Sequence, residues 1–317
     1  MRFVVLGAGG IGCYYAARLV AAGHRVVLVA RGAHLQALQQ HGLQVQHPQF
    51  RFQQAVVATD IDGLVRDYAA TSVDWLLLCA KSSATQPMLE QLKVWLAAHA
   101  SLPVLSLQNG VDNEAHIAAA IGKQRTIGGL AVKIGAHITA PGQVDATGIG
   151  QVDFGAWPQA RDNPMLHAKL PLLSQIFSEA KIPNTIYDNV NYALWRKLVI
   201  NNGVNPLTAL TLLDTQALTQ HPVFSHTVRA MMQETARAAN AEGVALTAAD
   251  VDEMYQLICG FDAIKTSMLV DRLKGRPMEL ADICGPVIRG CQAAGQPATT
   301  TELIQALLLN TVATATA

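Results

Sequence analysis

Short runs of β-branched and aliphatic residues alternate with helical stretches through the first part of the chain. An apolar run at Arg2 to Leu6, a helical pattern from about Gly10 to Ala22 and a second apolar run at His24 to Ala30 predict a βαβ unit. Further strand candidates lie at 56–58, 74–80, 103–107, 126–131, 150–155 and 185–187. We therefore expect a doubly wound, mostly parallel sheet, with antiparallel additions at the glycine-containing turns Pro141-Gly142 and Thr147-Gly148.

After about Asp188 the pattern changes to long stretches with apolar residues at helical spacing. The main ones cover 192–204, 223–241, 247–273 and 278–294. No strand pattern interrupts them, so we expect an all-helical second half. A chain of 317 residues also exceeds the usual size of one domain. The sequence thus predicts an α/β protein with two domains, residues 1–187 and residues 188–317, and a crevice between them.

Composition narrows the classes of function. Half of the residues are apolar, 15% are charged, and 23 basic side chains balance 23 acidic ones, as in a globular protein of ordinary surface potential. The sequence has no dense Lys/Arg run, which argues against a nucleic-acid partner. Its apolar stretches are too short for a signal peptide or a membrane span, so we expect a cytoplasmic protein with no membrane partner. Its histidines and cysteines lack the spacing of metal ligands, and we expect no metal site.

The segment Gly7-Ala8-Gly9-Gly10-Ile11-Gly12 has the GxGxxG spacing, directly after a predicted strand and at the start of a predicted helix. In that context Gly7 makes a tight turn, Gly9 lets the backbone approach a pyrophosphate, and Gly12 allows close helix–strand packing. The N–H groups at the helix start then face the phosphates. This motif predicts a dinucleotide site; the alternative is a glycine-rich turn that binds nothing.

Arg31 stands near the end of the second predicted strand, where an NAD enzyme usually carries Asp or Glu for the ribose hydroxyls. A guanidinium there suits a 2′-phosphate, which predicts NADP(H) rather than NAD(H). Lys81 and Asn109 follow two further predicted strands, at the sheet edge where ligands of such folds bind. Both can reach the nicotinamide ribose, a phosphate or the substrate. For all three residues, the alternative is an ordinary solvated side chain.

Three polar residues, Lys197, Asn201 and Asn205, recur every four positions in an otherwise apolar helical stretch. They share one helix face, which either meets water or lines a polar cleft. Reduction of a ketone by hydride leaves an alkoxide that needs a proton, and a lysine ammonium can supply both that proton and a stabilising charge. The chemistry favours the cleft. Further along, Glu279 follows Pro277 at the start of a predicted helix. By its position alone, Glu279 is either a charge that caps this helix or a catalytic residue.

These segments together resemble the ketopantoate reductase (2-dehydropantoate 2-reductase) family over nearly the whole chain. The similar stretches are the GxGxxG motif, Lys81, Leu107-Gln108-Asn109-Gly110, Leu194-Trp195-Arg196-Lys197-Leu198, Asn205-Pro206-Leu207-Thr208-Ala209, and Ser267-Met268 followed by Glu279. The resemblance implies a Rossmann domain followed by a helical domain like the C-terminal domain of 6-phosphogluconate dehydrogenase. Catalysis would take place in the crevice between them.

The resemblance also implies roles for individual residues. Lys197 would be the general acid, and Glu279 would hydrogen-bond the substrate and orient it. Asn201, Asn205 and Ser267 would bind the carboxylate and hydroxyl of the substrate. Asn109 and Lys81 would lie near the nicotinamide and its ribose, with Asn109 also near the substrate and Glu279 also near the cofactor.

The sequence departs from the family pattern around the substrate. Ile264 stands where the family often has asparagine, Met278 replaces the usual threonine, and Ala281 and Cys284 lie within the altered run after Glu279. A site that lacks a polar partner can reject a substrate built around that partner. The departures therefore leave the identity of the keto acid open.

We expect an NADPH-dependent reductase that converts 2-dehydropantoate to pantoate for pantothenate synthesis. One alternative is a reductase of another small branched 2-keto acid on the same fold, and another is a non-catalytic NADPH-binding sensor. Apolar helices near the C-terminus also permit a homodimer, although burial in the core explains them equally well.

Overall fold

The computed structural model describes residues 1–261 and 263–315, and the chain divides into two compact units. The first unit comprises Met1–Gln108 and Asn113–Val190, and the second comprises Asn109–Asp112 and Asn191–Ala317. The short segment Asn109–Asp112 thus groups with the helical unit, although the chain on both sides of it belongs to the β-rich unit. No pattern in the sequence predicts this excursion.

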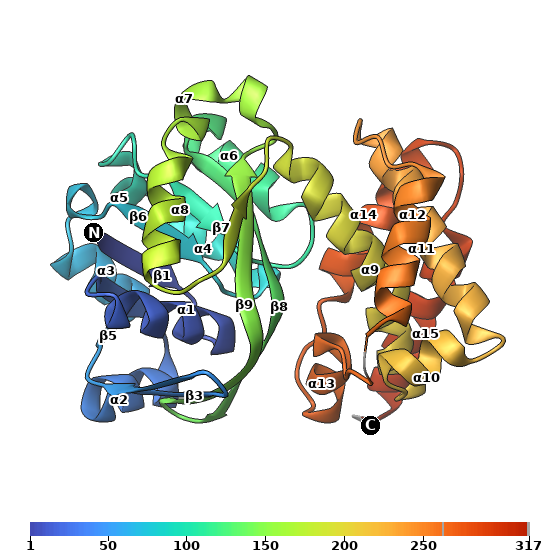
Figure 1. Ribbon diagram of the computed structural model, residues 1–317, viewed down its shortest axis with the longest axis horizontal. Coiled ribbons are helices and arrows are strands. Elements are labelled where there is room, and N and C mark those ends of the chain that lie inside the picture. The colour runs from blue at the N-terminus through green and yellow to red at the C-terminus, as the bar shows by residue number, and fades with distance from the viewer. Residues whose placement is uncertain (262, 316–317) are drawn as a thin grey trace. The chain divides into compact units, whose positions relative to one another are not determined.

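A ten-stranded mixed sheet forms the centre of the first unit (Figure 1). Its order is β4-β3-β9-β8-β7-β6-β1-β2-β5, with β10 paired to β9. All pairs from β8 through β7, β6, β1 and β2 to β5 are parallel, as predicted for a doubly wound fold. The strands are β1 Arg2–Leu6, β2 Arg25–Val29, β3 Leu43–His47, β4 Phe50–Gln54, β5 Val57–Thr59, β6 Trp75–Leu78, β7 Val104–Ser106, β8 Thr126–Ala140, β9 Gln143–Ala156 and β10 Asn184–Ile186.

Successive side chains of the parallel strands enter two separate apolar cores, one on each face of the sheet. Val4 of β1 lies in a core with residues of α3 to α6, whereas Phe3 and Val5 lie in a core with residues of α1 and α8. Burial on both faces requires strands that are apolar throughout, which explains their continuous apolar runs. The helices of this unit are α1 Gly10–Ala21, α2 Gly32–His41, α3 Ile61–Asp67, α4 Thr85–Gln91, α5 Lys93–Ala97, α6 Asn113–Ile121, α7 Pro164–His167 and α8 Leu170–Glu179.

Strands β8 and β9 form a long antiparallel hairpin that turns at Pro141-Gly142, where Gly142 has a φ of +79°. The second turn, predicted at Thr147-Gly148, is wrong, because both residues lie inside β9 and pair with β8. An irregularity in β8 at Lys133, whose φ is +51°, keeps the two strands paired past the glycine. The β3–β4 hairpin was not predicted, although the alternating burial of Leu43, Val45 and His47 has a strand period.

Helices make up the second unit in the part of the chain that the structure describes. They are α9 Val190–Thr211, α10 Thr215–Gln220, α11 Phe224–Ala241, α12 Ala248–Cys259, α13 Ser267–Leu273, α14 Leu280–Ala293 and α15 Thr299–Ala315. The helical stretch predicted over 247–273 contains two helices, α12 and α13. Two threonines each begin a helix there, since Thr247 accepts a hydrogen bond from the backbone N–H of Asp250 and Thr266 accepts one from Leu269.

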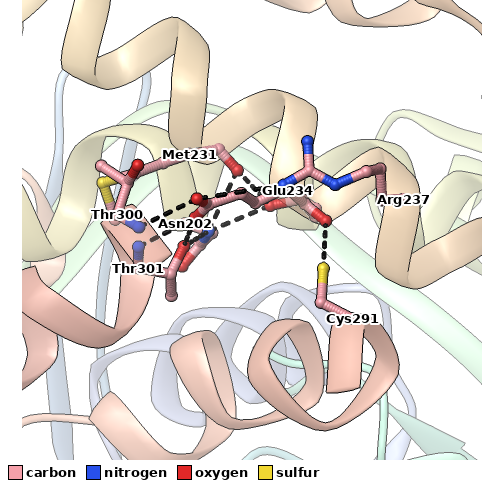
Figure 2. Close-up of polar contacts among 8 residues, drawn as sticks. Asn202, Met231, Glu234, Arg237, Cys291, Thr300 and Thr301 are labelled. Atoms are coloured by element: carbon pink, nitrogen blue, oxygen red, sulfur yellow. Dashed lines mark hydrogen bonds and ion pairs between the residues drawn. The ribbon is translucent and has the colours of Figure 1, made fainter. Parts of the chain in front are cut away.

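A buried carboxylate joins two of these helices (Figure 2). Glu234 of α11 is 4% exposed and accepts hydrogen bonds from the backbone N–H groups of Thr300 and Thr301, at 2.9 and 2.8 Å, at the start of α15. The Thr301 hydroxyl donates to the same carboxylate at 2.7 Å. Because a helix start is partially positive, it compensates the buried charge. Glu234 therefore caps α15, although it lies 66 residues before Thr300 in the sequence.

The packing of α11 against α14 gives a stability prediction. A Cβ atom added at Gly290 of α14 would lie 2.8 Å from the Cβ of Ala238 and 2.9 Å from its Cα, so one helix would have to shift. We expect Gly290→Ala to lower the free energy of unfolding by about 1–3 kcal/mol, as measured by chemical denaturation.

Gly285→Ala in the same helix is the matched control. A Cβ added there would approach only the flexible end of Arg289, at 3.1 Å. This variant should be neutral or gain up to about 1 kcal/mol from the higher helix propensity of alanine. Equal effects of the two substitutions would contradict the close approach at Gly290.

Candidate functional site

The glycine-rich turn after β1 is bent back over the end of β2. Gly7 has a φ of +94°, and the N–H groups of Gly7 and Ala8 both donate to the carbonyl of Val29, at 3.2 and 2.9 Å. A Cβ at Gly7 would lie 2.5 Å from the backbone nitrogen of Ala80. Only glycine combines this φ with this close approach. The turn thus delivers the chain directly into the start of α1.

The start of α1 has the properties of an anion-binding site. The first N–H groups of a helix have no acceptor within it, and here they belong to Gly10, Ile11 and Gly12. No side chain caps the helix, and its first turn contains no acidic residue. A Cβ at Gly9, the N-cap, would meet nothing within 4 Å, whereas one at Gly10 would lie 2.1 Å from the carbonyl oxygen of Ala136. An open space in front of uncapped N–H groups fits a pyrophosphate.

Arg31 is exposed and occupies the N-cap position of α2, two residues after β2 ends. The first turn of α2 carries no acidic residue that would repel a phosphate. His34, which the sequence analysis missed, anchors this helix: its Nδ1 accepts from the backbone N–H of Gly142 at 3.1 Å, and its Nε2 lies 3.6 Å from the Cys13 sulfur. Burial lowers the pKa of the imidazole. His34 therefore acts as a neutral link between α2, α1 and the β8–β9 turn.

Lys81 is exposed, two residues beyond the Cys79 that follows β6, and buried polar side chains hold the surrounding backbone. Gln108 donates to the carbonyl of Ala80 at 2.8 Å and to the hydroxyl of Thr85 at 2.8 Å. Asn113 donates to the hydroxyl of Ser82 at 3.3 Å. These bonds tie the loop after β6 to the chain after β7, within the first unit. Both sides of the excursion at Asn109–Asp112 are thereby fixed.

In the second unit, α9 carries the predicted polar stripe. Lys197 and Asn201 are half-buried and Asn205 is buried, which does not fit a freely solvated face. Arg196, which directly precedes Lys197, pairs with Glu253 of α12 at 2.7 Å. The residue that follows Asn201 is Asn202, whose side chain is buried in the interior of the unit.

Asn202 fixes the rotation of α9 about its axis (Figure 2). It is fully buried, and its amide nitrogen donates to the hydroxyls of Thr235 and Thr301, at 3.0 and 3.1 Å. The same nitrogen lies 3.3 Å from the carbonyl oxygen of Met231, which shares one of the two amide hydrogens. Because these acceptors come from α11 and α15, a rotated α9 would lose all three bonds. The directions of the neighbouring stripe residues are set by this buried amide.

Glu279 and Asn109 meet within the second unit. The amide nitrogen of Asn109 donates to Oε2 of Glu279 at 3.3 Å, although 170 residues separate them in the sequence. Glu279 is the N-cap of α14, where the helix dipole favours a negative charge, and its side chain makes no capping hydrogen bond. Asp112, at the other end of the same segment, pairs with Arg289 of α14. The excursion of the chain at Asn109–Asp112 thus brings a strand-end asparagine to this carboxylate.

The residues that depart from the family pattern have different surroundings. Ile264 is 45% exposed, and its backbone exchanges two hydrogen bonds with Thr215, at 3.0 and 3.2 Å. Ser267 and Ala281 are exposed, and Met278 is half-buried. Cys284 is fully buried in α14, where burial raises the pKa of its thiol to about 12. Of these departures, Cys284 is a core residue, whereas Ile264 presents an apolar side chain at the surface of its unit.

Among the described residues, His, Cys, Asp and Glu side chains form no group of three or more that could hold a metal ion. Within the same part of the chain, no helix is long and apolar enough to cross a membrane.

Comparison with known proteins matches both halves of the chain to one family. The model described as "Ketopantoate reductase PanE/ApbA" matches residues 3–159, and "Ketopantoate reductase PanE/ApbA C terminal" matches residues 189–311. The 2-dehydropantoate 2-reductase of Pyrococcus abyssi is 27% identical over 97% of each chain. A crystal structure of a PanE/ApbA family ketopantoate reductase from Ralstonia eutropha is 30% identical, with a TM-score of 0.86 over 99% of each chain.

The fold also occurs in a D-mandelate dehydrogenase solved with NADH and anilino(oxo)acetate, which is 23% identical, with a TM-score of 0.89 and full coverage of both chains. That likeness concerns the fold alone. The two family models and the 30% identical structure carry the assignment: the chain belongs to the ketopantoate reductase family of NAD(P)-dependent oxidoreductases, which act on a CH–OH group.

Proposed function

We propose that this protein reduces 2-dehydropantoate to pantoate with NADPH, as a step of pantothenate biosynthesis. The hydrogen bond between Asn109 and Glu279 carries the proposal, because it joins two residues from opposite ends of the chain that the family resemblance assigns to one site. Relatives that match the chain almost end to end bear the name 2-dehydropantoate 2-reductase. Its location in the cytoplasm and its assembly as a homodimer stay predictions.

In the proposed reaction, the cofactor would supply the hydride that reduces the C2 carbonyl of the keto acid. The ammonium of Lys197 stabilises the negative charge that develops on the carbonyl oxygen and gives that oxygen a proton, so the ketone becomes a secondary alcohol. Glu279, held by Asn109, accepts a hydrogen bond from the substrate and orients it. Asn201, Asn205 and Ser267 donate hydrogen bonds to the carboxylate and hydroxyl groups of the substrate.

Most of the proposed cofactor contacts lie on the first unit, whereas Asn109 and Glu279 belong to the second. The N–H groups at Gly9 to Gly12 would bind the pyrophosphate, in the open space that the missing side chain of Gly9 leaves. Arg31 would bind the 2′-phosphate and so favour NADPH over NADH. Lys81 would lie near the nicotinamide ribose.

A second candidate is the reduction of another branched 2-keto acid by the same residues. The apolar side chain of Ile264 favours it, since the family often has asparagine at this position and Ile264 cannot hydrogen-bond the 4-hydroxyl group of 2-dehydropantoate. Because two backbone hydrogen bonds to Thr215 hold Ile264, a substitution there should alter chemistry rather than the path of the chain.

Replacement of the proposed proton donor is the main test. We expect Lys197→Ala to lower kcat for 2-dehydropantoate by a factor of about 10² to 10⁴, because neither the proton nor the stabilising charge is then available. The dissociation constant for NADPH should stay near that of the wild type. Both are measured by NADPH absorbance and fluorescence.

Lys274→Ala, which removes an exposed lysine of the same unit, should keep full activity. Turnover by Lys197→Ala close to that of the control would disprove the assignment of the proton donor. If the wild-type protein binds NADPH tightly but none of the 2-keto acids tested causes it to oxidise NADPH, the sensor alternative is supported instead.

Cofactor preference is tested at Arg31. We expect Arg31→Ala to raise KM for NADPH by a factor of about 10 to 100, the effect of losing a charge-assisted hydrogen bond, and to leave KM for NADH nearly unchanged. Arg25→Ala, at the opposite end of the same strand β2, should change neither value. A similar rise for both cofactors would place Arg31 outside the 2′-phosphate site.

Substrate choice is tested at Ile264 with two keto acids that differ by a single hydroxyl group, 2-dehydropantoate and 3,3-dimethyl-2-oxobutanoate. We expect Ile264→Asn to raise the ratio of their kcat/KM values by about tenfold in favour of 2-dehydropantoate, whereas Ile264→Val keeps the ratio. A wild-type preference for the compound without the hydroxyl would favour the second candidate. An unchanged ratio in Ile264→Asn would remove Ile264 from the specificity site.

A further inference from the structure

Two buried threonines connect α9 to the start of α13. The hydroxyl oxygens of Thr208, on α9, and Thr266, the N-cap of α13, lie 2.6 Å apart. Thr208 is fully buried and Thr266 is 8% exposed. The resemblance of the sequence to its family assigns a role to neither threonine.

The hydrogen bonds around the pair determine which hydroxyl donates. The Thr208 hydroxyl donates to the carbonyl of Asn205 at 2.9 Å, which uses its one hydrogen. Thr266 therefore donates to Thr208, while its own oxygen accepts from the backbone N–H of Leu269 at 3.2 Å. The result is a continuous chain of hydrogen bonds from Leu269 through both threonines to Asn205. Bonds in such a chain polarise and strengthen one another in a buried setting.

Both ends of this chain adjoin proposed substrate ligands. Asn205 is itself one of them, and Ser267 directly follows Thr266 as the first residue of α13. Pro206, inside α9, has no N–H to give to the carbonyl one turn earlier, so the backbone is less constrained where Asn205 lies. The Thr208 hydroxyl adds a bond to the backbone at that point.

A second contact shows that α13 is held along α9. The guanidinium of Arg272, near the end of α13, donates to the carbonyls of Ala209 and Leu210 in the last turn of α9. Arg272 and the threonine pair thus bind the two ends of a seven-residue helix to the helix that carries Lys197. The threonine pair is the contact next to Ser267.

We propose that the Thr208–Thr266 pair is a positioning device, which sets Ser267 relative to Asn205 and so determines the affinity for the keto acid. This inference rests on the proposed function, because it takes Asn205 and Ser267 as substrate ligands. The threonines touch neither the substrate nor the cofactor in this account. They act through the two residues that they hold.

The test is Thr208→Val, which removes the hydroxyl but keeps the shape of the side chain and leaves Thr266 free to cap α13. We expect KM for 2-dehydropantoate to rise about tenfold, with kcat within about threefold of the wild type, since substrate binding is weakened and the proton donor is untouched. The dissociation constant for NADPH should not change. Thr208→Ser, which restores the hydroxyl, should return KM to the wild-type value.

Thr211→Val is the matched control, because the Thr211 hydroxyl also donates within α9, to the carbonyl of Leu207 at 2.8 Å, but has no partner threonine on α13 among the described contacts. It should keep the wild-type KM. If Thr208→Val does not fold, Thr208→Ala is measured in the same way. This variant removes the methyl group of the side chain together with the hydroxyl.

The outcomes separate the two proposals. Wild-type and Thr211→Val proteins that fail to reduce 2-dehydropantoate would refute the proposed function, and the inference with it. Active controls together with an unchanged KM in Thr208→Val or Thr208→Ala would refute the inference alone. A KM that rises in Thr208→Ser as much as in Thr208→Val would also refute it, because the hydroxyl would then not be the cause.

Discussion

The parallel strands of the first unit are buried on both faces, and this burial constrains most of what surrounds them. A strand with no solvated face must be covered by helices on each side, so the chain has to cross from strand to helix and back repeatedly. Each return ends at the same edge of the sheet, where backbone groups leave the hydrogen-bonded ladder. The glycine-rich turn, Arg31 and Lys81 all stand at such strand ends, within this one unit.

The second unit depends on buried polar groups instead of a sheet. Asn202 donates to acceptors on two other helices, and Glu234 accepts from the start of α15. Leaving the amide nitrogen of Asn202 or the carboxylate of Glu234 without hydrogen bonds in a core would be costly, so both groups favour the arrangement that provides these partners. Apolar packing alone would tolerate small rotations of α9. The buried amide does not, and it thereby fixes the face on which Lys197 lies.

Helix starts serve opposite purposes in the two units. The start of α15 is closed by Glu234 and that of α13 by Thr266, so their N–H groups are satisfied inside the protein. The start of α1 has glycine at the N-cap and no side-chain cap, which leaves its N–H groups for a ligand. The same physical feature thus stabilises the fold in one place and provides a candidate binding site in another.

The sequence by itself determined the elements whose signals are local. The apolar run of β1, the glycine turn that follows it and the helical second half could be predicted because each depends on neighbours within a few residues. Prediction failed where local signals were ambiguous: Thr147-Gly148 has the composition of a turn, yet an irregularity in the partner strand keeps it within β9. The break before Ser267 was missed because helical spacing continues across it.

Only the tertiary structure decided which distant residues meet. Asn109 reaches Glu279, His34 reaches Gly142, and Thr208 reaches Thr266, each across at least 58 residues of sequence. A hydrogen bond needs a partner within about 3 Å, and nothing in the local pattern of one segment specifies the partner in another. The sequence could therefore nominate the chemical groups of the candidate site, whereas the packing of the chain determined which of them lie together.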